Sequence, residues 1–254
     1  MPLVCRAFMV SMRAMRIIES SSPNFDSRNG QAIDMLVMHY TDMLSCDEAV
    51  ARLCDEAAQV SAHYVVDETG EVHQLVAESE RAWHAGESHW RGHNNINARS
   101  IGIEICNPGH TNGYRAFPLR QMKSVITLAQ GIIDRHSIPA RNVVGHSDIA
   151  FLRKDDPGEL FDWQSCARNG VGLFPFEAQA LSGQPLQRGD TGTPVTRLQT
   201  ALGNWGYGLK LDGDYGEKTE KCVIAFQRHY RPSRLDGIWD NECSGLLAAL
   251  HGVV

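Results

Sequence analysis

The chain has 254 residues, a formal net charge of -6 at pH 7, and hydrophobic and charged fractions of 43% and 21%. These values are typical of a soluble globular protein with one large domain, or with a large and a small one. The negative charge argues against a nucleic-acid partner bound without regard to sequence, because such binding needs a basic surface. No run reaches the roughly 18 apolar residues of a transmembrane segment, so none is expected.

The first residues do not form a clear signal peptide. The stretch from Met1 to Met15 is apolar but interrupted by Arg6 and Arg13, whereas a signal peptide needs about 7–15 uninterrupted apolar residues. Scattered cysteines without a Cys-x-x-Cys pair lean toward a reducing compartment. We therefore treat residues 1–19 as an N-terminal extension, and these features favour the cytoplasm.

The next part of the chain, residues 20–177, alternates short β-rich runs with helical patterns. We expect helices at 45–59 and 119–136, and strands at 33–40, 62–66, 72–76, 100–106 and 142–146. The sequence Asp67-Glu68-Thr69-Gly70 between the second and third strands predicts a β-hairpin. This alternation predicts an α/β domain with a central mixed β-sheet flanked by helices.

The C-terminal part has a different composition. Residues 178–193 are rich in Gly, Ser, Gln, Pro and Thr, which is typical of a linker between domains. Residues 194–254 predict three helices, which begin near 195, 217 and 240. An Asp-Gly turn precedes the second helix and another precedes the third, which indicates an internal repeat within a small three-helix domain.

Residues that can bind a metal follow two of the expected strands. His39 ends the strand 33–40, His146 ends the strand 142–146, and the loop after His146 contains Asp156. Open α/β sheets carry their sites at such strand ends. Imidazole and carboxylate are zinc ligands, and a set of three leaves one tetrahedral position for water, as catalytic zinc sites do. A structural role, which is the more common one for a single histidine, stays open at this point.

Two further charged residues fit hydrolytic chemistry. Glu104 interrupts the apolar strand 100–106, where a carboxylate is costly unless it is paired or functional, and it is a candidate general base. Lys154 precedes Asp156 by two residues, and an ammonium there can stabilise the oxyanion that forms at an attacked carbonyl. The alternatives are a buried ion pair or an outward-facing side chain for Glu104, and a solvated surface side chain for Lys154.

These residues lie in a series of blocks that resembles the type 2 family of N-acetylmuramoyl-L-alanine amidases, relatives of the peptidoglycan recognition proteins. The resemblance covers most of residues 20–165, and its blocks are Ser22–Arg28, Val37–Thr41, Ser61–Asp67, Ala82–Gly86, Ser100–Glu104, Gly145–Ala150 and Lys154–Gly158. One departure is Phe151-Leu152, where a more polar or Pro-containing loop is expected. The resemblance implies the zinc amidase fold, with Zn2+ bound by His39, His146 and Asp156. It also implies Glu104 as the base and Lys154 as the transition-state stabiliser.

The same resemblance implies a substrate and its contacts. Enzymes of this family hydrolyse the amide bond between N-acetylmuramic acid and L-alanine in peptidoglycan or muropeptides. The side chains that we expect at the substrate wall are Trp83, His84, Asn94 and Asn95, with a place in the core as the alternative for Trp83. The tail resembles the helical peptidoglycan-binding domain, which implies an anchor on the cell wall; the matching positions include Gly192, Leu198, Gln199, Asp212-Gly213, Phe226-Gln227 and Asp236-Gly237.

Two other functions stay open beside a cell-wall amidase. One is a non-catalytic recognition protein, which commonly lacks a metal ligand, whereas all three are present here. The other is a cytoplasmic amidase that recycles anhydro-muropeptides. The lack of a clear signal peptide favours it, whereas the wall-binding tail favours the periplasm or cell envelope. We expect a monomer, and we expect a chain without residues 181–254 to keep cleaving small soluble substrates.

Overall fold

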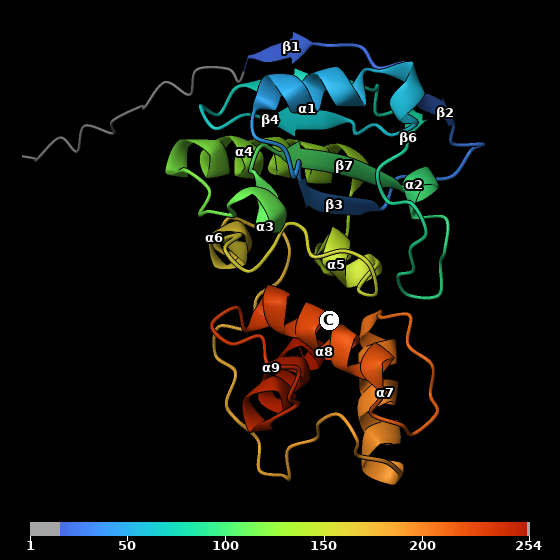
Figure 1. Cartoon of the computed structure of the whole chain (residues 1–254), viewed down its shortest axis with the longest axis vertical. Coiled ribbons are helices and arrows are strands. Elements are labelled where there is room, and N and C mark those ends of the chain that lie inside the picture. Colours follow the sequence, from blue (N-terminus) through green and yellow to red (C-terminus); the bar gives the residue numbers. More distant parts are fainter. Residues whose placement is uncertain (1–15, 253–254) are drawn as a thin grey trace, which may run out of the picture.

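A computed structural model describes residues 16–252, so the expectations for Met1–Met15 lie outside the described residues. A six-stranded mixed sheet has the order β1-β5-β4-β7-β3-β8, and β2 pairs with β6 in a small second sheet (Figure 1). The strands are β1 (Ile17–Glu19), β2 (Phe25–Ser27), β3 (Met35–Tyr40), β4 (Tyr64–Val66), β5 (Val72–Gln74), β6 (Glu80–Ala82), β7 (Ser100–Ile105) and β8 (Val143–Gly145).

Helices flank this sheet, and three more helices form the C-terminal module. Within the described residues the helices are α1 (Cys46–Leu53), α2 (Ile96–Arg99), α3 (Gly109–Asn112), α4 (Leu119–His136), α5 (His146–Ile149), α6 (Trp163–Arg168), α7 (Thr193–Trp205), α8 (Glu217–Tyr230) and α9 (Asn241–Gly252). The predicted class, a mixed sheet flanked by helices with a small helical part at the C-terminus, is confirmed. None of the helices between residues 16 and 252 has the length and apolar character needed to cross a bilayer.

The expected helices and strands are present; the strands are one or two residues shorter than predicted, and one helix is much shorter. The helix 119–136 has the predicted bounds, and β4 and β5 form the predicted antiparallel hairpin. The Asp67 side chain fixes that turn by accepting the N–H groups of Thr69 and Glu71 at 2.8 and 2.7 Å. The helix expected at 45–59 ends at Leu53, because Asp55 caps a separate 3-10 turn by accepting the N–H of Ala57 at 3.0 Å.

Alternation along β3 and β7 decides which side chains lie next to α4. One face of these strands packs in the core with α4, through Leu36, Met38, Ile101, Ile103 and Ile105. Successive side chains of a strand point to opposite faces. His39 on β3 and Ser100, Gly102 and Glu104 on β7 therefore lie on the face away from α4. Apolar alternation thus gathers polar residues on one side of the sheet.

The C-terminal module uses one hydrogen-bonding motif twice, as the predicted repeat requires. Gln199 of α7 donates to the Asp212 carboxylate and accepts the N–H of Gly213, both at 2.9 Å. Gln227 of α8 makes the equivalent bonds to Asp236-Gly237 at 2.9 and 3.0 Å. Each glutamine fixes the Asp-Gly turn in the loop before the next helix. The two turns are therefore stabilised in the same way.

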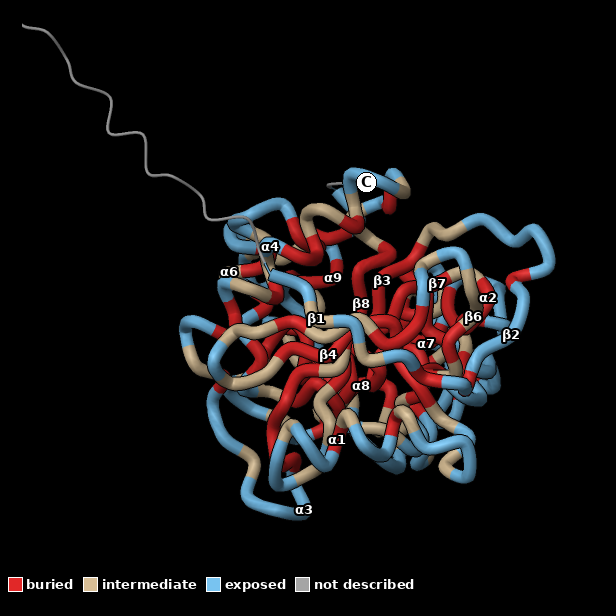
Figure 2. Tube along the Cα trace, turned by 90° about the horizontal axis from the view of Figure 1, so that it is seen from above, coloured by how far each residue is buried: buried red, intermediate tan, exposed pale blue. Residues whose placement is uncertain are grey.

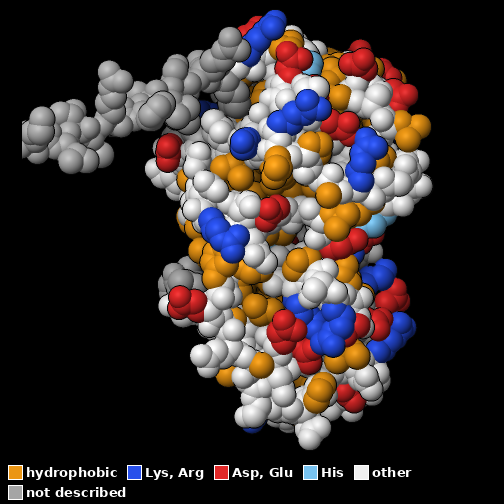
Figure 3. All heavy atoms as spheres, turned by 90° about the vertical axis from the view of Figure 1, so that its left-hand side faces the viewer, with side chains coloured by type: hydrophobic (Ala, Val, Ile, Leu, Met, Phe, Trp, Pro, Cys, Tyr) orange, Lys and Arg blue, Asp and Glu red, His pale blue; other side chains and the backbone are white. Residues whose placement is uncertain are grey.

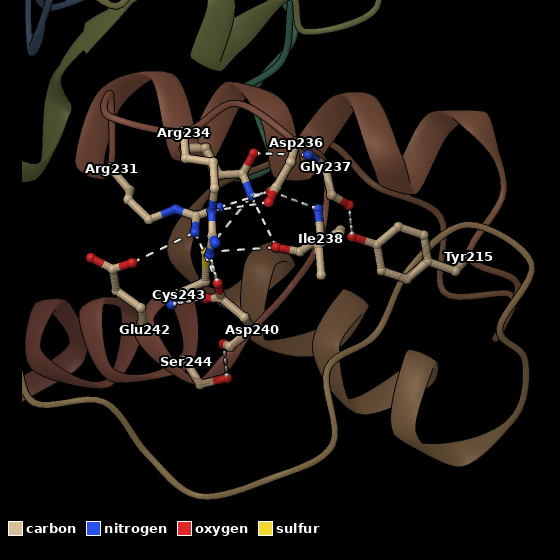
Figure 4. A network of polar contacts seen from close by, with 11 residues as sticks. Tyr215, Arg231, Arg234, Asp236, Gly237, Ile238, Asp240, Glu242, Cys243 and Ser244 are labelled. Atoms are coloured by element: carbon tan, nitrogen blue, oxygen red, sulfur yellow. Dashed lines mark hydrogen bonds and ion pairs between the residues drawn. The ribbon is translucent and has the colours of Figure 1, made fainter.

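The second half of the repeat differs from the first by a buried arginine. The Arg231 guanidinium is 2% exposed and pairs with Asp236 and Asp240 at 2.9 Å each, with Glu242 at 3.6 Å (Figure 4). This network fills the space between the end of α8 and the start of α9.

The part that contains the sheet shares one hydrophobic core with the C-terminal module. Buried residues concentrate at the centre of the molecule (Figure 2), and one cluster joins Val37 and Trp90 to Leu202 and Phe226. Lys and Arg side chains are interspersed with Asp and Glu on the face shown in Figure 3. Residues 178–193 pair with the module through bridges such as Leu186 with Trp239. The domain limits at 177 and 193 remain a proposal.

Candidate metal centre and active site

Three neighbouring parallel strands bring the predicted ligands together. β3 lies between β7 and β8 and is parallel to both, so their carboxyl ends meet at the same edge. His39 lies near the end of β3, and His146 is the first residue of α5, directly after β8. Glu104 on β7 is the register partner of His39. The structure therefore brings His39, His146 and Glu104 to one edge of the sheet, where the strand-end argument had placed the two histidines.

The atoms of the proposed ligands converge on one point. His39 Nδ1 and His146 Nδ1 are 3.0 Å apart, and each is 3.0 Å from Asp156 Oδ2. All three residues are buried, with exposures of 1%, 3% and 5%. The Ser147 N–H donates to the Asp156 backbone carbonyl at 2.8 Å, which ties the segments of the last two ligands together. This set is able to hold a metal ion.

Hydrogen bonds on the far side of His146 fix its tautomer. His146 Nε2 is 3.1 Å from the Ala85 backbone carbonyl, which only accepts hydrogen bonds. The tautomer with the proton on Nε2 satisfies this acceptor and leaves the lone pair of Nδ1 pointing toward Asp156 and His39; the Arg153 guanidinium lies farther from Nε2, at 3.4 Å. Metal-binding histidines typically donate their other N–H in this way.

A longer chain of hydrogen bonds fixes the tautomer of His39. The Ser100 hydroxyl donates to the Ile96 carbonyl at 2.7 Å, so its oxygen must accept from His84 Nε2 at 3.0 Å. His84 Nδ1 then accepts from His39 Nε2, also at 3.0 Å. Consequently His39 Nδ1 is left with a free lone pair at the proposed metal position. His84, which we expected at the substrate wall, thus also orients a ligand from behind.

The electrostatics of the set suit a cation. Burial lowers the pKa of His39 to about 4, and the charge of His146 acts in the same direction. Burial by itself raises the pKa of Asp156, but His146 and His39 outweigh it and hold that pKa well below its usual range. Near pH 7 the site therefore offers a neutral imidazole and an ionised carboxylate, the forms in which these groups bind metals.

The spacing also fits zinc. Bonds of about 2.0–2.2 Å in a tetrahedral site place ligand atoms about 3.3–3.6 Å apart. The observed separations of 3.0 Å are slightly shorter than these edges. Two nitrogens that both present lone pairs at this distance repel one another, so a cation between them removes the repulsion. The donor set, its protonation and its geometry all agree with a divalent metal.

The set opens into a pocket of about 370 Å³, whose lining includes His146, Asp156, Glu104 and Lys154. The Glu104 Oε2 atom is covered and has no hydrogen-bond partner among the described residues. Burial raises the pKa of Glu104 well above its ordinary value, the charge of Asp156 adds to this, and the charge of Lys154 opposes it. Because Glu104 lines this pocket and its Oε2 atom is covered, it is not an outward-facing surface side chain.

The residues expected at the substrate wall are not all in this pocket. Trp83 is half-buried and lines it together with His84. Asn94 is exposed, bonds to His89 at 2.7 Å and lines a separate groove next to Phe151 and Leu152. Asn95 precedes α2 and lines another hollow of the surface. The structure brings the first pair together and leaves the asparagines apart from them.

The pocket also contains residues that the sequence did not single out. The Tyr40 hydroxyl is 2.9 Å from His110 Nδ1, and His110 Nε2 is 3.1 Å from Glu159. Tyr40 and His110 line the pocket. The partners are 70 and 49 residues apart in the chain, so no local pattern connects them. Ser100, which orients His84, was also not singled out. Its polar position on the His39 face of β7 is a sequence signal that could have identified it.

The fold and the site together define a class of protein. A buried His-His-Asp set beside a glutamate, at the carboxyl ends of parallel strands, is the arrangement of a metal-dependent hydrolase. Residues 29–159 match the family model for N-acetylmuramoyl-L-alanine amidase, and the chain belongs to this family. It is an enzyme that hydrolyses the amide bond between N-acetylmuramic acid and L-alanine. Residues 191–247 match a model for peptidoglycan binding domains, as the tail predicted.

Similar proteins agree with this assignment over most of the chain. The N-acetylmuramoyl-L-alanine amidase AmiD of Escherichia coli is 38% identical, over 92% of this chain and 90% of the relative. The structure of AmiD with a muropeptide substrate has a TM-score of 0.76 at 35% identity, covering 91% and 98% of the two chains. AmpDh3 of Pseudomonas aeruginosa has a TM-score of 0.71 at 27% identity, covering 97% and 99%. The non-catalytic alternative is not favoured.

Proposed function

We propose that the chain is a zinc-dependent amidase in which His39, His146 and Asp156 hold the metal, Glu104 is the general base and Lys154 stabilises the oxyanion. The observation that carries this proposal is the convergence of three buried ligand atoms at 3.0 Å, with both Nδ1 lone pairs directed inward by outer hydrogen bonds. The Oε2 atom of Glu104 is covered and has no hydrogen-bond donor among the described residues, which supports a carboxylate that is free to accept a proton during the reaction.

The residues of the pocket divide the work of hydrolysis. His39, His146 and Asp156 would hold a zinc ion, which would polarise the substrate carbonyl and lower the pKa of water to about 7. Glu104 takes the proton from the attacking water and delivers it to the departing L-alanine amine. The Lys154 ammonium balances the negative charge that develops on the carbonyl oxygen. The charge of Lys154 acts to lower the pKa values of both Glu104 and His39, which supports a position of Lys154 beside the reacting atoms.

We further propose that the substrates include anhydro-muropeptides. The structure of AmiD contains anhydro-N-acetylmuramic acid-L-Ala-D-gamma-Glu-L-Lys as its substrate, and AmpDh3 has been solved with anhydromuramic pentapeptide. The similarity to these two proteins spans nearly the whole chain. Every residue of the proposed centre comes from a single chain, which supports action as a monomer.

Two variants and a control test this function. His39→Ala is expected to lose both zinc and activity, because it removes a ligand. Glu104→Gln is expected to keep zinc and to lose about 10²–10⁴-fold in kcat, the range of a general base. His73→Ala changes a histidine that bonds to Ser20, outside the site, and should retain both. Zinc content is measured by mass spectrometry, and hydrolysis by chromatography of a synthetic anhydro-muropeptide.

Two results would contradict the assignment. Stoichiometric zinc in His39→Ala removes that residue from the ligand set. Full hydrolysis by Glu104→Gln removes Glu104 from the role of base, because glutamine cannot take up the proton.

A further inference from the structure

The C-terminal module contacts the segment that carries two of the three proposed ligands. We call residues 146–156 the ligand loop; it begins at His146 and ends at Asp156. α8 of the module lies beside α5, the first turn of this loop (Figure 1). The contacts are made near both ends of the loop, at Asp148 and at Asp155.

Asp148 is the main point of contact. Its carboxylate is 1% exposed and accepts three hydrogen bonds, each of 2.8 Å. The first comes from the N–H of Gly145, the residue before His146, and it caps the turn α5. The other two come from the module, from the Tyr207 hydroxyl and from His229 Nδ1. The module therefore supplies most of the polar partners of a buried carboxylate two residues from a ligand.

His229 is itself held between the two parts of the molecule. Its ring stacks on Trp163 of α6, with ring centroids 3.8 Å apart and planes inclined by 17°. The neighbouring residue on α8, Arg228, donates to Asp155 Oδ1 at 2.8 Å, directly before the ligand Asp156. Asp155 is largely exposed, so this second contact is the weaker one. Both ends of the ligand loop are nevertheless held by consecutive residues of one helix.

The apolar side of the loop is covered by the module as well. Ile149 and Ala150 belong to the same buried cluster as Tyr207 and Val223. Trp90 packs edge-on against Tyr207, with ring centroids 5.3 Å apart. The expectation that residues 181–254 are a removable anchor does not agree with this packing, because their removal exposes the core beside His146.

We propose that the peptidoglycan-binding module is a structural part of the metal centre, with Tyr207 and His229 as positioning residues for His146. Without their hydrogen bonds, the buried Asp148 carboxylate keeps a single partner and must move toward other donors or water. Since Asp148 caps the turn that begins at His146, such a movement displaces His146 Nδ1 from the other ligands. Loss of the contacts that orient a metal ligand lowers the affinity for the metal in this way. This inference rests on the proposed zinc centre.

A matched pair of substitutions in the full-length protein tests the inference. Tyr207→Phe removes the hydroxyl that bonds to Asp148. Tyr215→Phe removes a buried hydroxyl of the same module that donates to the Gly237 carbonyl at 2.8 Å, away from the ligand loop (Figure 4). The readouts are the zinc dissociation constant from competition with a chelator, kcat and KM on an anhydro-muropeptide, and the Tm of the zinc-free protein.

We expect both variants to lower Tm, because each loses a buried hydrogen bond. Only Tyr207→Phe should weaken zinc binding, by about 10-fold, and lower kcat with little change in KM. In a cycle with Asp148→Asn, the effects on zinc affinity should be non-additive, because both substitutions act through one contact. Zinc affinity and kcat in Tyr207→Phe equal to those of Tyr215→Phe, or additive effects in the cycle, would overturn the inference. Failure of the zinc centre itself is recognised separately, because the wild-type protein would then bind no zinc.

Discussion

Gly102→Ala is the substitution for which the structure gives the sharpest expectation. Gly102 lies on the His39 face of β7, and an added Cβ would lie 2.5 and 2.6 Å from Cγ and Nδ1 of His84. Ordinary contacts between such atoms are about 3.5–4.0 Å, so the ring must move by about 1 Å. His84 is buried and bonded to both His39 and Ser100, so it cannot move without breaking one of these bonds.

Two effects of this movement are measurable. Overpacking of a buried site costs about 1–3 kcal/mol, which urea unfolding of the zinc-free protein detects. Without the bond to His84, the proton of His39 is no longer held on Nε2. Loss of such a hydrogen-bond partner of a metal ligand weakens metal affinity by about 10–100-fold. Competition with a chelator measures the second effect.

The control is Gly203→Ala, within α7. Apart from the adjacent residues and the backbone of α7 itself, no atom lies within 4 Å of a Cβ added at Gly203. An alanine there should stabilise the protein by about 0.5–1 kcal/mol through helix propensity, with unchanged zinc affinity. If Gly102→Ala keeps both the wild-type stability and the wild-type zinc affinity, the argument that Gly102 makes room for a ligand-orienting histidine is refuted.

Two further predictions concern stability. Burial lowers the pKa of His63 to about 3, and the Arg28 charge acts in the same direction. The unfolded chain therefore binds a proton below pH 6.5 that the folded protein excludes, and the stabilising contribution present above pH 6.5 is lost as the pH falls toward 3, by about 1.4 kcal/mol per unit. Urea unfolding at pH 7 and pH 4 should show a smaller loss in His63→Asn than in the wild type, and equal losses would contradict this origin. A chain that ends at residue 180 should aggregate and lose activity on soluble muropeptides, because Trp90 and Ile149 become exposed; a monomeric, fully active fragment in size-exclusion chromatography and hydrolysis assays would contradict the shared core.

Much of the fold and the proposed centre could be read from local patterns. The alternation from Ser100 to Ile105 predicts a strand with apolar side chains toward α4, and hence a polar face that includes Glu104. His39 and His146 were placed by the rule that neighbouring parallel strands end at one edge of the sheet. These inferences hold because backbone geometry fixes the side-chain direction within a strand.

Contacts between distant segments could not be read in this way. His84 looked like a wall residue, and only its position over Gly102 shows that it orients His39. The loop that carries Asn94 and Asn95 places them in two other hollows of the surface, apart from the pocket. Sequence spacing does not report the path of such a loop.

The sequence by itself determined the five strands around the site, the helical repeat and the residue types of the proposed metal centre, because each depends on neighbours within a few positions. The tertiary structure alone decided that the tail packs against the ligand loop, residues 146–156. Asp148 meets Tyr207 and His229 across 59 and 81 residues, and nothing in the local sequence of either partner reports the other. The physical reason is that a buried carboxylate requires donors, whereas the chain position of those donors is set by how the C-terminal module packs against the rest of the molecule.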